Sequence, residues 1–184
     1  MGLKRQLNGF EIRYTINPRH YQPWQCLNSP AEAFEEHHST IGFDIDRKKT
    51  DLLTASGSKI RAMADPNVIQ KSAIIMICVP TPVTKAKDPD RGQVTGAART
   101  VGKNLKEGAI VVLESIVYSG VTEEFVVPIL KQESGLHCGK DFFVGYSPER
   151  INPNDDEHTL ERTTKIVSGM DEKTAYTSAR YTDW

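Results

Sequence analysis

The feature that most constrains the fold is a series of short apolar runs separated by helix-like stretches. Ser72–Val79 and Ala109–Leu113 are almost continuously apolar, which is typical of strands buried on both faces of a parallel sheet. Shorter strands are predicted at Thr40–Ile45, Phe142–Tyr146 and Lys165–Ser168. Helices are predicted between the strands, at Lys48–Thr54, Thr95–Leu105 and Thr122–Glu133. Strands that alternate with helices predict βαβ units and an α/β fold with a doubly wound parallel sheet.

Composition narrows the classes of function. The chain has 184 residues, which suits one domain, and its formal net charge of −1 predicts no broad basic surface for nucleic acid or a membrane. No apolar run approaches the roughly 18 residues that span a bilayer, and the first residues lack a signal-peptide pattern. We therefore expect a cytoplasmic protein. Cys26, Cys78 and Cys138 form no CxxC pair, so the sequence predicts no metal site.

Ligands of doubly wound sheets bind at the carboxyl ends of the strands, so the residues that follow each strand are the candidates. Asp44 ends the predicted strand Thr40–Ile45. An acid there accepts hydrogen bonds from the adenosine ribose hydroxyls of NAD, and its charge disfavours the additional phosphate of NADP. The alternative is a solvated acid that caps the next helix.

Two further strand ends carry hydroxyl groups. Pro80 and Pro82 stiffen the loop after Ser72–Val79 and leave Thr81 free to face a ligand, although an ordinary rigid turn would have the same residues. Ser115 begins a polar loop that leads into an acidic helix start, an arrangement that can hold an anion or position a water. The alternative is a plain strand–loop–helix joint with Ser115 and Thr122 as caps.

A charged pair follows the predicted strand Phe142–Tyr146. Glu149 and Arg150 lie in the segment Gly145–Pro153, where the carboxylate could act as a general base with the guanidinium as its electrostatic partner. A surface ion pair of little energetic value is the alternative, and composition by itself favours it.

Three of these segments together resemble a known family. CVPTP (78–82), ESIVYSGVTEE (114–124) and GYSPERINP (145–153) occur in the order and spacing of the UDP-glucose/GDP-mannose dehydrogenase family. Within it the chain is most similar to bacterial UDP-N-acetylhexosamine 6-dehydrogenases of surface-polysaccharide synthesis, over about residues 31–175. The resemblance implies a Rossmann-type domain and NAD-dependent oxidation of the C6 alcohol of a UDP-sugar, such as UDP-N-acetylglucosamine, to the uronate.

The resemblance also implies roles for individual residues. In the cofactor site, Asp44 would hold the adenosine ribose with Lys49 nearby, and Thr81 would contact NAD. Ser115 lies in the loop that contacts NAD and positions a catalytic water in the family.

In the substrate site, Glu149 matches the family acid that assists as base. Arg150 and Ile151 match positions that contact the sugar nucleotide, so a UDP-sugar is the implied partner. Family members are homo-oligomers, but the helical dimerisation segment and the domain that carries the catalytic cysteine would both lie beyond Trp184. The resemblance therefore predicts that this chain by itself is inactive.

The sequence departs from the family within the matching segments. Ile116 stands where the family has threonine, and an isoleucine side chain cannot hydrogen-bond a water. Ser119 replaces a proline, and Asn154 replaces a glycine.

The largest departure precedes Asp44. The family has a strand and a GxGxxG turn there, and a gap-free alignment places the three glycines at Gln22, Trp24 and Leu27. Bulky side chains at these positions would block the close approach of the backbone to the pyrophosphate. Pro18–His20 is also not typical of a central strand. The first βα unit is therefore predicted to be degenerate.

The predicted division is an irregular segment at 1–30, a Rossmann-like NAD-binding domain at 31–176 and an unpatterned tail at 177–184. A frameshift between about Arg13 and Pro30 is one hypothesis for the irregular segment. Shifting the frame forward by one nucleotide forces a glycine at Trp24, because the last two bases of the tryptophan codon, GG, followed by the first base of the Gln25 codon, encode glycine. The coding DNA tests this hypothesis directly.

Three other interpretations stay open at this stage. The first is that the chain is a non-catalytic remnant. The second is a weak NAD- or nucleotide-binding module that works with a separately encoded C-terminal half. The third is another Rossmann dehydrogenase. The segment Ser147–Arg150 argues against the last of these.

Overall fold

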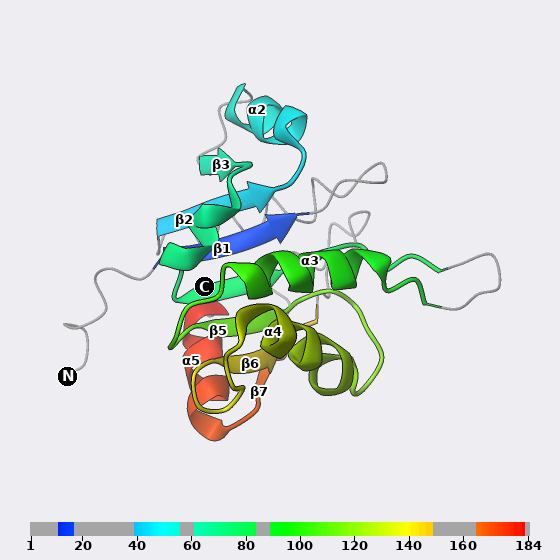
Figure 1. Ribbon diagram of the computed structural model, residues 1–184, viewed down its shortest axis with the longest axis vertical. Coiled ribbons are helices and arrows are strands. Elements are labelled where there is room, and N and C mark those ends of the chain that lie inside the picture. Colours follow the sequence, from blue (N-terminus) through cyan, green and yellow to red (C-terminus); the bar gives the residue numbers. More distant parts are fainter. Residues whose placement is uncertain (1–10, 17–38, 56–60, 84–88, 149–164, 183–184) are drawn as a thin grey trace.

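The computed structural model describes residues 11–16, 39–55, 61–83, 89–148 and 165–182. Within these residues, a seven-stranded sheet has the order β3-β2-β1-β4-β5-β6-β7 (Figure 1). Its strands are β1 (Glu11–Ile16), β2 (Ser39–Asp44), β3 (Arg61–Met63), β4 (Ile74–Ile77), β5 (Ile110–Leu113), β6 (Phe143–Tyr146) and β7 (Ser168–Gly169). Neighbouring strands pair in parallel except β7, which is antiparallel to β6. The predicted α/β fold with a doubly wound sheet is confirmed.

Helices connect these strands. The described helices are α2 (Arg47–Ala55), the 3-10 helix η1 (Pro66–Lys71), α3 (Gly92–Lys103), the π-helical turn η2 (Val121–Val126), α4 (Val127–Ser134) and α5 (Glu172–Thr182). Helix α3 places Val94, Ala98 and Val101 on one buried face, at the spacing of an amphipathic helix. Its Gly102 lets α4 approach closely, because a β-carbon at this glycine would lie 2.7 Å from Glu133 Cβ.

The two faces of the sheet carry different layers. Ile75, Ile77 and Val111 belong to the large apolar core that includes residues of α3 and α4. Successive strand residues point to opposite faces, so Gly145 faces away from this core, whereas Val144 belongs to it. Helix α5 packs on that second face, since a β-carbon on Gly145 would lie 3.3 Å from Ser178 Oγ.

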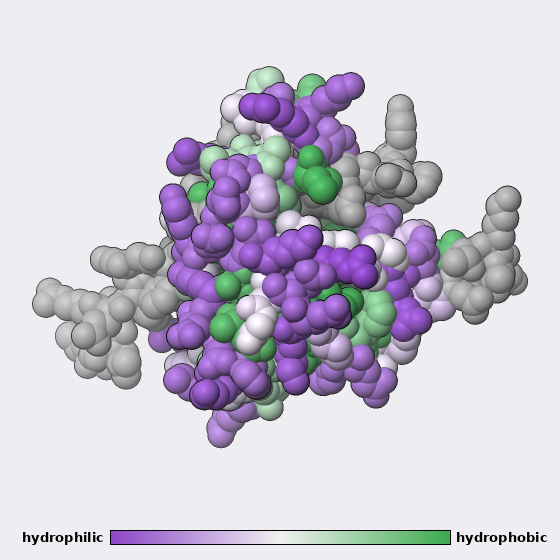
Figure 2. Space-filling view, viewed as in Figure 1, coloured by the Kyte–Doolittle hydropathy of each residue, from purple (hydrophilic) through white to green (hydrophobic). Residues whose placement is uncertain are grey.

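Hydrophilic side chains cover most of the face shown in Figure 2, as expected when the apolar residues lie in the sheet–helix core. None of the helices in the described part of the chain has the length and apolar character needed to cross a bilayer.

The structure corrects the expectation that residues 1–30 are irregular and that the first strand is lost. Glu11–Ile16 forms β1 in the centre of the sheet, paired in parallel with β2 and β4. The sequence EIRYTI alternates polar and apolar residues, which is the strand signal, and it lies just before Asn17–Pro18. Residues 1–10 and 17–38, including the expected helix end Ala31–His38, are outside the described residues.

The expected boundary at residue 176 and the unpatterned tail at 177–184 are also wrong for the described part. Helix α5 runs through this boundary to Thr182. Asp171 caps it by accepting a hydrogen bond from the Thr174 amide at 2.7 Å. Over residues 172–180, where burial is described, Thr174 and Ser178, one turn apart, are the buried residues of the helix, so this stretch presents small polar side chains to the sheet.

Candidate functional site

The polar residues of interest lie at the carboxyl edge of the sheet. Ile16 of β1 pairs with Asp44 of β2. One residue earlier in β1, Thr15 pairs with Ile77 of β4. Ile77 in turn pairs with Leu113 of β5, and Leu113 pairs with Tyr146 of β6. The residues at the level of Asp44 on those strands are therefore Cys78, Glu114 and Ser147, all of them buried. Because the pairing is in register, these four side chains start from the same face of the sheet.

Asp44 has one carboxylate oxygen bonded and one unbonded. The Asp46 amide donates to Asp44 Oδ1 at 2.8 Å, whereas the buried Oδ2 has no hydrogen-bond partner in the structure. Burial raises the pKa of Asp44 to about 6, and the Asp46 amide and the charge of Lys49 oppose that rise only in part. A buried oxygen without a donor is unfavourable by itself and can accept a hydrogen bond from a ligand hydroxyl.

The alternative for Asp44, a solvated helix cap, does not apply. Asp46 caps helix α2, since its Oδ1 accepts from the Lys48 amide at 3.0 Å. Asp44 is only 2% exposed. Its position at the end of β2 is as predicted, and its buried Oδ2 fits the ribose-binding role that the sequence suggested.

Thr81 and Ser115 lie on neighbouring loops, and both hydroxyls bind within the protein. Thr81 Oγ1 donates to the Ile116 carbonyl oxygen at 2.7 Å. Ser115 Oγ accepts from the Val79 amide at 2.9 Å and donates to the Ile77 carbonyl oxygen at 3.4 Å. The two hydroxyls therefore join the loops after β4 and β5, while their contacts with a cofactor stay predictions.

Sequence reasoning missed a buried charged cluster beside this joint, formed by Cys78, Glu114 and Lys165. The Cys78 thiol donates to Glu114 Oε2 at 2.8 Å, and Lys165 Nζ forms a short ion pair with Glu114 Oε1. Glu114 is 2% exposed. Cys78 is a buried thiol, as the apolar run around it predicted. An acid directly after a buried strand requires a partner, and this was the available signal.

The loop after β5 also contacts the start of α3. Arg91 donates to the Tyr118 hydroxyl at 3.1 Å, and its guanidinium lies 4.6 Å from the centre of the Phe125 ring. The Ile116 side chain is 65% exposed, so this departure from the family pattern lies at the surface of the loop.

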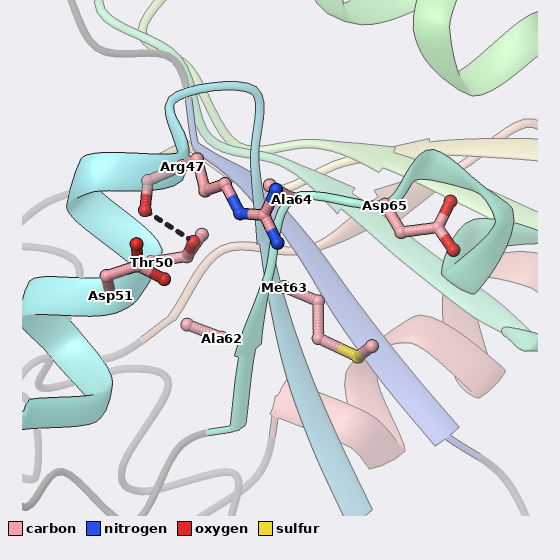
Figure 3. Close-up of a pocket in the computed structure, with 7 residues that line it drawn as sticks. All are labelled: Arg47, Thr50, Asp51, Ala62, Met63, Ala64 and Asp65. Carbon is pink, nitrogen blue, oxygen red and sulfur yellow. Dashed lines mark hydrogen bonds between the residues drawn. The ribbon is translucent and has the colours of Figure 1, made fainter.

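A cavity of about 460 Å³ lies between α2 and β3 (Figure 3). Its lining residues come from α2 and from β3 with the two residues that follow, namely Arg47, Thr50, Asp51, Ala62, Met63, Ala64 and Asp65. Thr50 Oγ1 donates to the Arg47 carbonyl oxygen at 2.9 Å, which ties the first turn of the helix together. The Arg47 side chain extends from the helix toward Ala64 (Figure 3).

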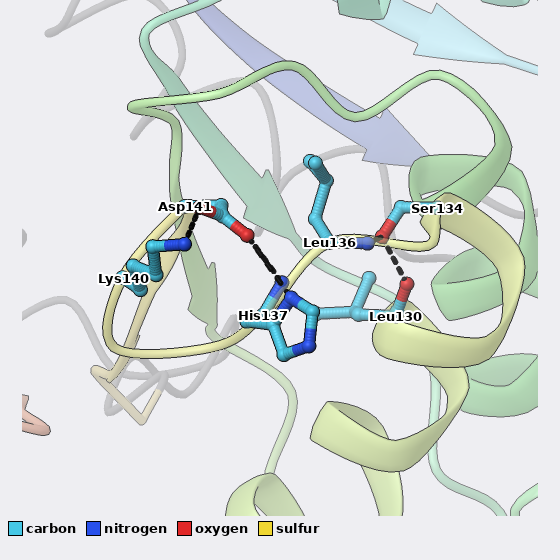
Figure 4. A network of polar contacts seen from close by, with 6 residues as sticks. All are labelled: Leu130, Ser134, Leu136, His137, Lys140 and Asp141. Carbon is cyan, nitrogen blue, oxygen red and sulfur yellow. Dashed lines mark hydrogen bonds and ion pairs between the residues drawn. The ribbon is translucent and has the colours of Figure 1, made fainter.

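A second polar network lies in the turn before β6 and has a structural role (Figure 4). Asp141 Oδ2 accepts from the His137 amide at 2.9 Å and contacts the His137 ring at 3.2 Å. The amide hydrogen bond is the main reason that the pKa of Asp141 is lowered. This turn precedes β6, so it lies at the amino-terminal edge of the sheet, opposite Asp44.

Several predicted site residues lie outside the described residues: Glu149, Arg150, Ile151 and Asn154 at the substrate side, and Gln22, Trp24 and Leu27 at the expected glycine positions. Their predicted roles remain predictions. Among the described residues, no cluster of His, Cys, Asp and Glu has the makings of a metal site.

These features define a class of protein. A parallel sheet whose strand order reverses between β1 and β4, with a buried acid at the end of β2, is a Rossmann-type nucleotide-binding domain. The crystal structure of NDP-N-acetyl-D-galactosaminuronic acid dehydrogenase from Methanosarcina mazei Go1 has this fold. It superposes with a TM-score of 0.76 and 24% identity, over 92% of this chain and 41% of that one.

A family model places the chain more narrowly. Residues 56–182 match the NAD binding domain of the UDP-glucose/GDP-mannose dehydrogenase family, and the chain belongs to that family. Protein CapL of Staphylococcus aureus is 45% identical over 153 residues. UDP-N-acetyl-D-glucosamine 6-dehydrogenase of Pseudomonas aeruginosa is 37% identical over 153 residues. Each alignment covers 76% of this chain and 36% of the relative, so the chain spans about a third of their length.

Proposed function

We propose that this chain is the cofactor-binding part of an NAD-dependent nucleotide-sugar 6-dehydrogenase of polysaccharide biosynthesis, acting in the cytoplasm. Its substrate would be a UDP-N-acetylhexosamine, such as UDP-N-acetylglucosamine. The family membership and the names of the similar proteins support this class of reaction. The observation that carries the proposal is the buried, unpartnered Oδ2 of Asp44 at the end of β2, where a ribose hydroxyl would supply the missing donor.

Each residue has a defined part in this proposal. Asp44 accepts the ribose hydroxyls, and the positive charge of Lys49 favours its ionised form. Thr81 and Ser115 hold the loops after β4 and β5 together at the side of the nicotinamide. NAD, when bound, supplies the hydride acceptor. By resemblance, Glu149 assists as base.

The substrate contacts of Arg150 and Ile151 come from the resemblance in the same way. We further propose that the 184 residues bind the cofactor without oxidising a sugar. The side chain of Ile116 offers no hydroxyl to orient a water for the oxidation.

Calorimetric titration of the chain with NAD tests the proposal. Asp44→Asn should weaken binding about tenfold, because the amide nitrogen cannot accept the ribose hydrogen bond. Asp46→Asn is the matched control, since it removes the same charge two residues away and keeps an oxygen for the Lys48 amide. Equal affinity of wild type and Asp44→Asn would contradict the proposal. Absence of binding at millimolar NAD would identify the chain as a non-catalytic remnant.

A further inference from the structure

Four successive residues of the loop after β5, Ser115–Tyr118, each accept a hydrogen bond from elsewhere in the fold. The donors, in the order of the residues that they bind, are the Val79 amide, the Thr81 hydroxyl, the Tyr146 hydroxyl and the Arg91 guanidinium. The first three bonds end on a buried hydroxyl or on a backbone carbonyl oxygen. The fourth ends on the Tyr118 side chain, which is 52% exposed, so Arg91 holds the exposed end of this loop.

Arg91 is itself fixed on several sides. It directly precedes helix α3, and the neighbouring Asp90 amide donates to the Pro82 carbonyl oxygen at 2.8 Å. Its guanidinium donates to the Tyr118 hydroxyl at 3.1 Å and lies 4.6 Å from the centre of the Phe125 ring. Phe125 belongs to η2, which follows the loop. Arg91 therefore joins the start of α3 both to the loop and to the helical turn after it.

The loop after β5 lies on one side of the point where the strand order reverses, between β1 and β4. A dinucleotide binds across this point, with one half on each side of it. In the proposed function, Asp44 of β2 takes the adenosine half. The nicotinamide half then falls on the side of β4 and β5, where Arg91 and Tyr118 meet.

We propose that Arg91 is a positioning residue for the nicotinamide half of NAD and acts through Tyr118. This role rests on the proposed function, which supplies the cofactor. The contact between the two side chains keeps the loop after β5 in the conformation that receives the nicotinamide half. Without it the loop populates this conformation less, and the apparent affinity for NAD falls by the same fraction.

Titration of the chain with NAD and with ADP-ribose tests the proposal, because ADP-ribose has the adenosine and the pyrophosphate but lacks the nicotinamide. Arg91→Met should weaken NAD binding about threefold to fivefold and leave ADP-ribose binding within about twofold. An equal loss for both ligands would mean that Arg91 attracts the pyrophosphate by its charge. That result, or unchanged NAD affinity, would overturn the inference and leave the proposed function standing. If wild type binds neither ligand at millimolar concentration, the proposed function fails and the inference fails with it.

Arg99→Met is the matched control. Arg99 carries the same charge on helix α3 but lies 3.7 Å from Glu133, on the side of α4. Its removal should leave both affinities within about twofold. A loss of NAD affinity equal to that in Arg91→Met would assign the effect to net charge and overturn the inference.

Tyr118→Phe tests the same contact without changing the charge. It should weaken NAD binding about as much as Arg91→Met, and the double variant should lose no more than either single one, because one contact is removed in all three. Losses that add in the double variant would show that the two residues act independently, and the inference would fail.

Hydrogen exchange tests the contact without any ligand. The Val121 amide donates to the Tyr118 carbonyl oxygen at 3.4 Å, so its protection depends on the position of Tyr118. Arg91→Met should speed exchange at Val121 about threefold or more, while the urea midpoint stays that of wild type because the contact is exposed. Unchanged exchange would overturn the inference whether or not NAD binds. A fall in the midpoint that accounts for the faster exchange would make Arg91 a structural residue and overturn it as well.

Discussion

Two buried carboxylates at the same level of the sheet differ in how they are satisfied. Asp44 and Glu114 are each 2% exposed, and both extend from the face that α5 partly covers. Glu114 binds the Cys78 thiol through one oxygen and the Lys165 ammonium through the other. Asp44 binds one backbone amide, and its second oxygen has no partner. The two acids are therefore equally buried, and the completeness of their hydrogen bonding is what distinguishes them.

The difference has an energetic consequence. Lys165 neutralises the charge of Glu114, and this ion pair links the segment before β7 to the end of β5. At Asp44, burial outweighs the favourable charge of Lys49, and its pKa rises to about 6. Near neutral pH the ionised Asp44 therefore destabilises the free protein, and a ligand that donates to Oδ2 would offset this.

The largest expected effect comes from breaking the satisfied carboxylate. Lys165→Met leaves the buried Glu114 without its cation and should lower the free energy of unfolding by about 3–5 kcal/mol. Urea denaturation measures the loss. Glu114→Gln combined with Lys165→Met removes both charges and should recover much of it. A loss below about 1 kcal/mol in Lys165→Met would show that the pair behaves as a surface ion pair.

Removing the charge of the unsatisfied carboxylate, Asp44, is expected to raise the free energy of unfolding. Asp44→Asn removes a buried charge and keeps an oxygen for the Asp46 amide. A pKa that rises from 3.8 to about 6 corresponds to about 3 kcal/mol. The new amide nitrogen inherits the unpartnered position, so a net stabilisation of about 1–2 kcal/mol at neutral pH is expected. Destabilisation by Asp44→Asn would mean that Oδ2 is satisfied in solution.

The pH dependence of stability in wild type and Asp44→Asn tests the raised pKa of Asp44. Folding raises the pKa of Asp44 from 3.8 to about 6, so the folded state holds this proton more tightly than the unfolded state. The destabilisation by ionised Asp44 is complete above about pH 6 and disappears below 3.8. The stability gap between Asp44→Asn and wild type should therefore close on acidification from pH 7 to pH 4, as measured by urea denaturation. A constant gap would refute the raised pKa.

The sequence predicted the sheet where its apolar pattern was strong. The runs around β4 and β5 and the helical spacing of α3 appear in the structure as predicted. Strand β1 was missed because its alternation is only six residues long and is followed by Pro18. Helix α5 was missed because the buried residues in its described part, Thr174 and Ser178, are small and polar, and a hydrophobic period does not detect such a face.

The site was predictable only in part, for a similar reason. The position of Asp44 at a strand end followed from the pattern of strands, and family motifs identified Thr81 and Ser115. The partner of Glu114 lies 51 residues away, and only the folded sheet brings Lys165 to it. The free oxygen of Asp44 depends on burial and on the amide of Asp46, which residue types do not specify.

The smallest effect is expected at Ile116, where the chain departs from its family at the surface of the loop after β5. Ile116→Thr restores the family hydroxyl on a side chain that is 65% exposed. The Ile116 carbonyl, which binds Thr81, is unaffected by the substitution. The free energy of unfolding should therefore change by less than about 0.5 kcal/mol. Adenosine affinity should also stay within about twofold of wild type, because the new hydroxyl lies after β5, three strands away from β2, where Asp44 is proposed to bind the ribose. A large gain in adenosine affinity would mean that the loop after β5 contacts the nucleoside, and that the division of roles between Asp44 and the Glu114 region is wrong.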